Sequence, residues 1–218
     1  MRTIRLEFLA LAGLASMVAA PVAVQAADAG HNAAAVYVAH LHPLNRSVTG
    51  HNASGEARFT ITGDDLTIRI DMRGVPPSLE HWQHFHGFKD NQDAACPGAT
   101  ADANHDGVID LIETGAAAGT TMVPFNADPA GMHVASDTYP KASADGTYDY
   151  RKTVSLKAMT AAFAKAFGDS DLALDRRVVF VHGVAPTAAL AGSVASLGTI
   201  PAQVTLPIAC GKIERAPR

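Results

Sequence analysis

Two runs of alternating polar and apolar residues constrain the fold of this chain more than any other feature of its sequence. The runs are residues 57–62 and 66–71, and Gly63-Asp64-Asp65 lies between them. Alternation with a period of two is typical of strands that bury one face, and the intervening residues are a turn signal. The pattern predicts an antiparallel hairpin, which ends at residues 74–77 because their two prolines donate no ladder hydrogen bonds.

Further segments have the composition of short strands, whereas a single segment has the spacing of a helix. Strands are predicted from Val36 onward and at residues 82–88, 121–125, 147–154, 177–181 and 204–213. In the helix, predicted at residues 155–167, apolar side chains recur at helical spacing, Ser155 can cap the start and Gly168 can end it. Short strands with one helix favour a sandwich or barrel over βαβ units. We therefore predict a mainly β domain over residues 36–218.

Residues 1–26 have the three parts of a secretory signal peptide. Arg2 and Arg5 supply a positive start, residues 8–24 are almost all apolar, and Val24-Gln25-Ala26 offers small residues at the cleavage positions. An uncleaved membrane anchor is the alternative, but small residues and a proline interrupt the apolar stretch and no stop-transfer pattern follows. We predict an exported protein, periplasmic or extracellular, with a flexible lead-in at residues 27–35.

The charge pattern excludes some classes of partner. The formal net charge is −4, and no cluster of Lys and Arg follows the signal peptide. We therefore predict no nucleic-acid partner. No later segment is long and apolar enough to cross a bilayer, so no membrane span is predicted after signal cleavage. All ten histidines follow the signal peptide, which is a large number for a chain of this size.

The two cysteines, Cys96 and Cys210, lie far apart in the sequence. In an exported chain an isolated pair favours a disulfide over two free thiols. Closing so long a loop would stabilise the fold by roughly 4 kcal/mol on the chain-entropy account. This prediction depends on export, because the cytosol keeps thiols reduced.

Residues 102–113 match the twelve-residue calcium loop of an EF-hand at every constrained position. Oxygen ligands are offered by Asp102, Asn104, Asp106, the backbone carbonyl of Val108, Asp110 and Glu113, and Gly107 permits the sharp turn. Calcium prefers such an all-oxygen shell, so the loop predicts a calcium cofactor. The alternative is an acidic surface turn without a metal.

The surroundings of this loop differ from those of a paired EF-hand. Cys96-Pro97-Gly98 occupies the place of the entering helix, so only the exiting side, residues 111–118, can be helical. A lone loop in an exported protein predicts a structural site filled by millimolar calcium. A conformational sensor is disfavoured, because sensors open a pair of helices. His105 falls at a non-ligating position and is expected to face solvent.

Three histidines have the spacing of a transition-metal site. His84 and His86 are two residues apart and therefore share one face of a strand, and His182 ends the apolar run 177–181. Imidazole suits both copper and zinc, so the three predict a metal site if the two strands are neighbours. The alternative is that they are ordinary core or surface histidines. Trp82 and Phe85 are expected to pack in the core.

Several short motifs resemble copper-zinc superoxide dismutase. They are His84-Phe85-His86, a polar loop leading to Cys96, the apolar strand ending at His182, and the closing segment 208–213 with Cys210 between Ala and Gly. The resemblance implies a Greek-key β-sandwich with copper ligands at His84, His86 and His182. It also implies a Cys96–Cys210 disulfide and superoxide as the substrate.

The early part of the chain, residues 38–86, also resembles the CHRD domain, the module named from chordin. The resemblance is carried by residues 54–68 and by the motif His84-Phe85-His86-Gly87. It implies the same Greek-key β-sandwich, here with one short helix and an inserted calcium loop. For such a module, the ligand is expected to be an envelope or matrix component.

Two departures from the dismutase pattern bear on activity. The region that supplies the bridging and zinc histidines in that family holds the calcium loop here, with His105 and His133 as its only histidines. Pro207 stands where the family has the arginine that guides superoxide. A dismutase without that arginine loses steering and orientation of the anion.

These features lead to two functional hypotheses. The first is an exported, calcium-stabilised, metal-binding CHRD-like module that binds a ligand or handles copper without catalysis. The alternative is a copper-dependent superoxide dismutase acting in the periplasm. A copper site would need a fourth ligand, and the sequence leaves His81, His40, His42 and His133 open for that role. His40 and His42 could instead form a separate surface site, although an exposed strand is the simpler expectation.

Overall fold

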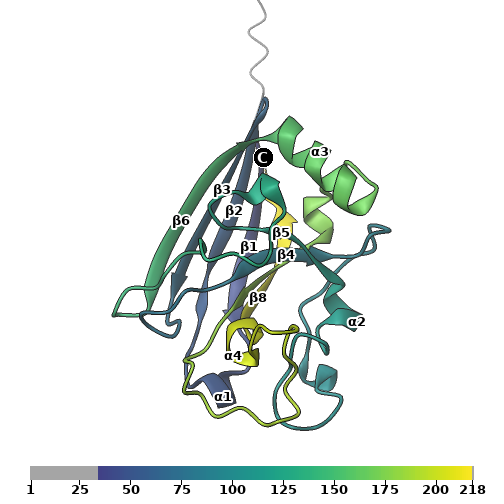
Figure 1. Cartoon of the computed structure of the whole chain (residues 1–218). Helices are drawn as coiled ribbons and strands as arrows, with labels where there is room; N and C mark the ends of the chain where they lie inside the picture. The colour runs from purple at the N-terminus through teal and green to yellow at the C-terminus, as the bar shows by residue number, and fades with distance from the viewer. Residues whose placement is uncertain (1–33, 218) are drawn as a thin grey trace, which may run out of the picture. The chain divides into compact units, whose positions relative to one another are not determined.

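Figure 1 shows the computed structural model, which describes residues 34–217. The predicted signal peptide and nearly all of the predicted lead-in lie outside the described residues. The described chain forms one curled antiparallel sheet of eight strands in the order β5-β4-β7-β8-β1-β2-β3-β6. The strands are β1 (Ala35–Pro43), β2 (Ser54–Thr62), β3 (Asp65–Arg73), β4 (Gln83–Gly87), β5 (Thr120–Pro124), β6 (Thr147–Ser155), β7 (Val178–His182) and β8 (Pro207–Arg215). The prediction of a mainly β domain is confirmed.

The predicted hairpin is present as β2 and β3. Thr62 pairs with Asp65 across a turn in which Gly63 has a φ of 59°, a conformation that glycine adopts without strain. The apolar positions of both strands, including Phe59, Ile68 and Ile70, are buried, while Arg58 and Arg69 on the other face are exposed. The period-two pattern therefore identified the buried face of the hairpin.

One long helix accompanies the sheet. The helix α3 spans Leu156–Phe167; the Ser155 side chain accepts a hydrogen bond from the backbone N–H of Ala158, and Gly168 ends the helix with a φ of 85°. Phe163 on its buried face lies 6.1 Å from Phe85 between ring centroids. The prediction of this helix and of both its ends is confirmed. Shorter helical segments are α1 (Arg46–Thr49), α2 (Gly115–Ala118), α4 (Ala202–Thr205), and 3-10 turns at Ala99–Ala101, Pro129–Gly131 and Leu174–Arg176.

Two predicted elements begin several residues later in the structure than the sequence indicated. The closing strand begins at Pro207 and not at residue 204, because α4 occupies Ala202–Thr205 and the Leu206 N–H bonds to the carbonyl of Ala202. The helical exit of the predicted calcium loop covers only Gly115–Ala118. Residues 111–114 before it form a hydrogen-bonded turn, in which the Asp110 carboxylate accepts the backbone N–H groups of residues 112 and 113.

The two faces of the β4–β7–β8 region pack against different layers. Phe85, Val179 and Val181 point into the main core, while Val178 and Phe180 belong to a second buried cluster on the opposite face. The second cluster lies under the segment 88–119, which the Cys96–Cys210 disulfide joins to β8. The predicted disulfide is confirmed. This covered outer face also carries the histidines described below.

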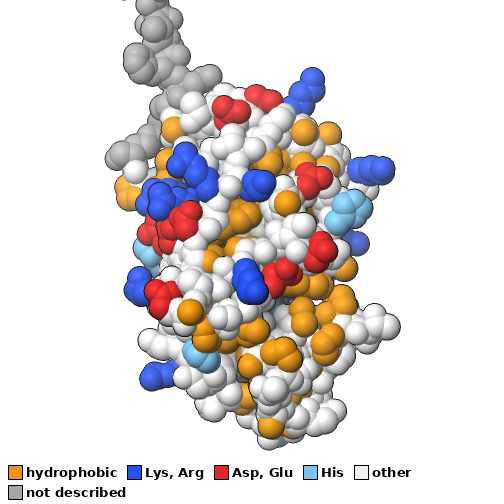
Figure 2. All heavy atoms as spheres, turned by 60° about the vertical axis from the view of Figure 1, so that its left-hand side comes forward, with side chains coloured by type: hydrophobic (Ala, Val, Ile, Leu, Met, Phe, Trp, Pro, Cys, Tyr) orange, Lys and Arg blue, Asp and Glu red, His pale blue; other side chains and the backbone are white. Residues whose placement is uncertain are grey.

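On the face shown in Figure 2, basic and acidic side chains are interspersed. Arg69 and Asp71 pair at 2.9 Å, and Arg58 and Glu56 pair at 3.0 Å. Within residues 34–217, no helix has both the length and the apolar character that crossing a membrane requires.

Candidate metal centre

The antiparallel pairing of β4 with β7 brings the three predicted ligands together. His84 lies opposite Phe180, and His182 follows Phe180 by two residues on the same face. One ring nitrogen from each of His84, His86 and His182 lies within 4.8 Å of the other two. No other set of three or more His, Cys, Asp or Glu side chains in the described part of the chain meets this distance. We call these three residues the histidine triad.

All three imidazoles of the histidine triad are buried, with 3%, 6% and 5% of His84, His86 and His182 exposed. Burial lowers the pKa of each, well below the ordinary value for His84 and His86 and to about 4 for His182. The cause is that a charged imidazolium loses its hydration in the protein interior. The rings are therefore neutral near pH 7, the form in which a histidine nitrogen binds a metal.

Hydrogen bonds orient two of the rings and leave specific nitrogens free. His182 Nδ1 lies 2.7 Å from the carbonyl oxygen of Thr205, and His86 Nε2 lies 3.1 Å from the Thr121 hydroxyl. Among the described residues, His182 Nε2, His86 Nδ1 and both nitrogens of His84 have no hydrogen-bond partner. Buried polar groups are normally paired. The free nitrogens therefore fit a bound metal, with the backbone and hydroxyl partners fixing the tautomers.

Aromatic rings complete the surroundings of His84 and His86. His84 meets Trp82 and Tyr139 edge-on, at centroid distances of 6.2 Å and 5.6 Å. Phe180 lies 4.7 Å from the His86 ring. Phe85 packs in the core as predicted. Trp82 is buried as predicted and also lines the cavity at the histidine triad, because it lies two residues before His84 and shares its face.

A cavity of about 360 Å³ opens onto the histidine triad. Besides the triad, its walls are Trp82, Leu111, Gly119, Thr120, Thr121, Val134, Leu197 and Thr205. None of the described residues that line it is charged. The Thr205 hydroxyl is buried and has no hydrogen-bond partner among residues 34–217. Sequence reasoning missed Thr121, Thr205 and Tyr139, because each comes from a loop or strand distant in the chain from His84.

None of the four other candidate histidines joins the triad in the described structure. Both ring nitrogens of His81 lie 2.9 Å from backbone carbonyl oxygens, those of His182 and Pro76. His133 is exposed, with Val134 lining the cavity in its place. His40 and His42 project from the exposed face of β1. The triad thus has three protein nitrogens, with the cavity beside them.

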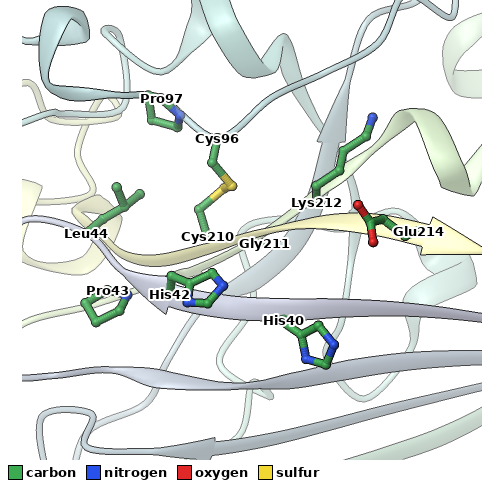
Figure 3. Close-up of a pocket in the computed structure, with 10 residues that line it drawn as sticks. All are labelled: His40, His42, Pro43, Leu44, Cys96, Pro97, Cys210, Gly211, Lys212 and Glu214. Atoms are coloured by element: carbon green, nitrogen blue, oxygen red, sulfur yellow. A yellow bond between two sulfur atoms is a disulfide. The ribbon is translucent and has the colours of Figure 1, made fainter.

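His40 and His42 lie at a separate cavity of about 520 Å³, shown in Figure 3. The Cys96–Cys210 disulfide, Lys212 and Glu214 also line it. His40 Nδ1 is 3.8 Å from a carboxylate oxygen of Glu56, and both histidines are exposed. They are therefore exposed to solvent and lie apart from the buried triad.

The predicted calcium loop is folded around its own acidic side chains. The Asp102 carboxylate accepts backbone N–H groups of Asp106 and Gly107, at 3.1 Å and 2.9 Å. Glu113 reaches back across the loop to the N–H of Ala103 at 2.8 Å. Gly107 has a φ of 83°, as the predicted sharp turn requires, and His105 is exposed. The carboxylates are not gathered as closely as the triad nitrogens.

Contacts from distant segments hold this loop beside the cavity. The Asn45 side chain bonds both the N–H and the carbonyl of Ile109, each at 2.8 Å, and also the carbonyl of Pro207 at 2.9 Å. Asp106 accepts the Ser193 hydroxyl at 2.6 Å, and Asp110 accepts the Ala195 N–H at 2.7 Å. Two cavity-lining residues, Leu111 and Leu197, lie in the segments that these bonds join.

No protein-family model matches this sequence, and no curated protein is significantly similar to it.

Proposed function

We propose that this chain is an exported, calcium-stabilised β-sandwich module of CHRD-like type that binds copper at His84, His86 and His182 and handles it without catalysis. The observation that carries the proposal is the histidine triad. Three neutral, buried imidazoles present unpartnered nitrogens within 4.8 Å of one another at the floor of a cavity. Copper bound there would be held by these nitrogens, with Thr205 and Thr121 orienting His182 and His86.

The strand order supports the Greek-key part of this proposal. β4 does not pair with β3, and β6 does not pair with β5, so long connections carry the chain between distant parts of the order. Neighbours that are not consecutive in sequence are what a Greek-key connection produces. The calcium assignment is supported by the match of residues 102–113 to the loop template and by the positive φ of Gly107.

Copper-dependent superoxide dismutation is the second candidate, favoured by the cavity that would let a small molecule reach the metal. Two observations favour copper handling over this alternative. Pro207, at the position of the guiding arginine, pairs with His182 at the start of β8. No charged side chain lines the cavity in the described residues, so no side chain there would steer an anion toward the metal. A cavity lined by uncharged side chains is compatible with holding copper, but it lacks the positive charge that would guide superoxide to the metal.

The test is metal stoichiometry and superoxide turnover on purified protein lacking residues 1–26. The His84→Ala/His86→Ala double variant removes two triad ligands, and His40→Ala/His42→Ala is the matched control on the exposed face of β1. We expect one tightly bound copper in the wild type and in the control, none in the triad variant, and no turnover in any of them.

The other outcomes are informative in different ways. Turnover that disappears in the triad variant would replace copper handling by the dismutase. Copper lost from the control and kept by the triad variant would move the site to His40 and His42. Absence of tight copper from the wild type would overturn the proposed function.

A further inference from the structure

The partners of the histidine triad carry no negative charge. His182 faces a backbone carbonyl, His86 faces a hydroxyl, and neither nitrogen of His84 has a partner among the described residues. Glu80 lines a neighbouring cavity that shares Trp82, but it does not line the cavity at the triad. An ion bound to the triad would therefore meet three neutral ligands and no compensating anion.

A site of this kind discriminates between ions by charge. The free energy of moving an ion from water into a low-dielectric interior rises with the square of its charge, so a divalent ion costs about four times as much as a monovalent ion of similar size. Attraction to a carboxylate normally offsets this cost for divalent metals. The surroundings of the triad, formed by Trp82, Tyr139 and Phe180, offer aromatic rings instead.

The number of protein ligands also favours a monovalent ion over a divalent one. The described structure brings three histidines together, while His81 is engaged by two carbonyl oxygens and His133 is exposed. Cu(II) prefers tetragonal arrangements of four or more ligands and Zn(II) a tetrahedron, so either ion would need further ligands, such as water from the cavity. Cu(I) is stable with three. Metal-binding histidines donate their other ring N–H to a carboxylate, a backbone carbonyl or water, and here the two partners, a carbonyl and a hydroxyl, carry no charge that would favour a divalent ion.

We propose that the triad selects Cu(I) over Cu(II) and Zn(II), so that the cargo of this module is monovalent copper. The selectivity presupposes that the triad binds copper, as proposed above. On this proposal Thr121 contributes to the selectivity for Cu(I). Its neutral hydroxyl contacts His86 at a position where a carboxylate would favour a divalent metal.

The experiment compares affinities in competition with chelators, for Cu(I) under anaerobic reducing conditions and for Cu(II) and Zn(II) separately. The wild-type protein is expected to bind Cu(I) at least ~100-fold more tightly than Cu(II), which raises the reduction potential of bound copper by about 120 mV relative to the free ion pair. Thr121→Asp places a carboxylate beside His86 and should reduce the preference at least ~10-fold by strengthening divalent binding. Thr121→Val, which removes the hydroxyl without adding charge, should keep the preference.

Failure of this inference can be told apart from failure of the proposed function. Equal or tighter binding of Cu(II) or Zn(II) by the wild type, abolished in the His84→Ala/His86→Ala variant, would overturn the selectivity and leave the metal site standing. An unchanged preference in folded Thr121→Asp protein, checked by circular dichroism, would also overturn it. If neither oxidation state of copper bound to the triad, the proposed function itself would be wrong.

Discussion

Burial of His182 gives this residue a pH-dependent contribution to stability. In the metal-free folded protein desolvation lowers its pKa to about 4, whereas an unfolded histidine titrates near 6.5. Between these values the unfolded chain binds the additional proton. The stability associated with the neutral ring is therefore complete above about pH 6.5 and falls as the pH decreases toward 4, by roughly 3 kcal/mol at most. Urea denaturation of metal-free protein at pH 7, 5.5 and 4 measures this loss.

Two glutamine variants distinguish the contribution of His182 to the loss of stability from the general effect of acid on the protein. His182→Gln should reduce the pH dependence between 6.5 and 4 without abolishing it, because glutamine does not titrate while the buried His84 and His86, whose pKa values are also lowered, remain. His42→Gln, at an exposed position of β1, should retain the full wild-type dependence. Parallel curves for wild type and His182→Gln would contradict the assignment of the effect to this ring.

At the scale of elements, the predicted calcium loop ties the segment 186–200 to the sheet. Removing calcium with EGTA should lower the melting temperature, because the carboxylates of Asp102, Asp106 and Asp110 would repel one another without the ion. The hydrogen bond from the N–H of Ala195 to the Asp110 carboxylate should weaken as well, because Asp110 is one of the predicted calcium ligands and would move when the ion is removed. Differential scanning calorimetry and amide exchange at Ala195 measure the two effects.

Two substitutions in the loop make this test specific. Asp102→Asn removes a predicted ligand and should abolish the response to EGTA. His105→Asn alters an exposed, non-ligating position at which φ is 59°, a conformation asparagine tolerates, and should leave the response intact. A wild-type melting temperature that EGTA does not change would show that the loop is an acidic turn without calcium.

At the scale of the whole molecule, the disulfide connects β8 to the segment that covers the histidine triad. The Cys96→Ser/Cys210→Ser variant should lose roughly 4 kcal/mol of unfolding free energy, because a link between residues 114 apart restricts the unfolded chain. Its copper affinity should also fall, since the segment 88–119 leads directly into the cavity wall at Gly119–Thr121. Urea denaturation and chelator competition measure these changes, and dithiothreitol should affect the wild type alone. Equal stability of both proteins under oxidising conditions would contradict this account.

Local features of the sequence were sufficient to predict the secondary-structure elements and part of the candidate metal site. The period-two pattern identified the β2–β3 hairpin, and the spacing of apolar residues with Ser155 and Gly168 identified α3 and its ends. His84 and His86 share a face because the backbone of any strand is pleated. Such features depend on residues a few positions apart. The position of the closing strand was less predictable, because α4 forms through contacts with the β7 end.

Local sequence patterns are therefore enough to predict a mainly β chain with a His-x-His pair on one face of a strand and a cysteine pair suited to a disulfide. Bringing His182 beside His84 and His86 depends on the register of β4 against β7, strands about ninety positions apart in the chain, which no local pattern encodes. The tertiary structure also decided that Trp82 faces the cavity, that His81 is engaged elsewhere, and that the walls are uncharged. These properties come from long-range packing, which brings together side chains whose separation in sequence carries no local signal.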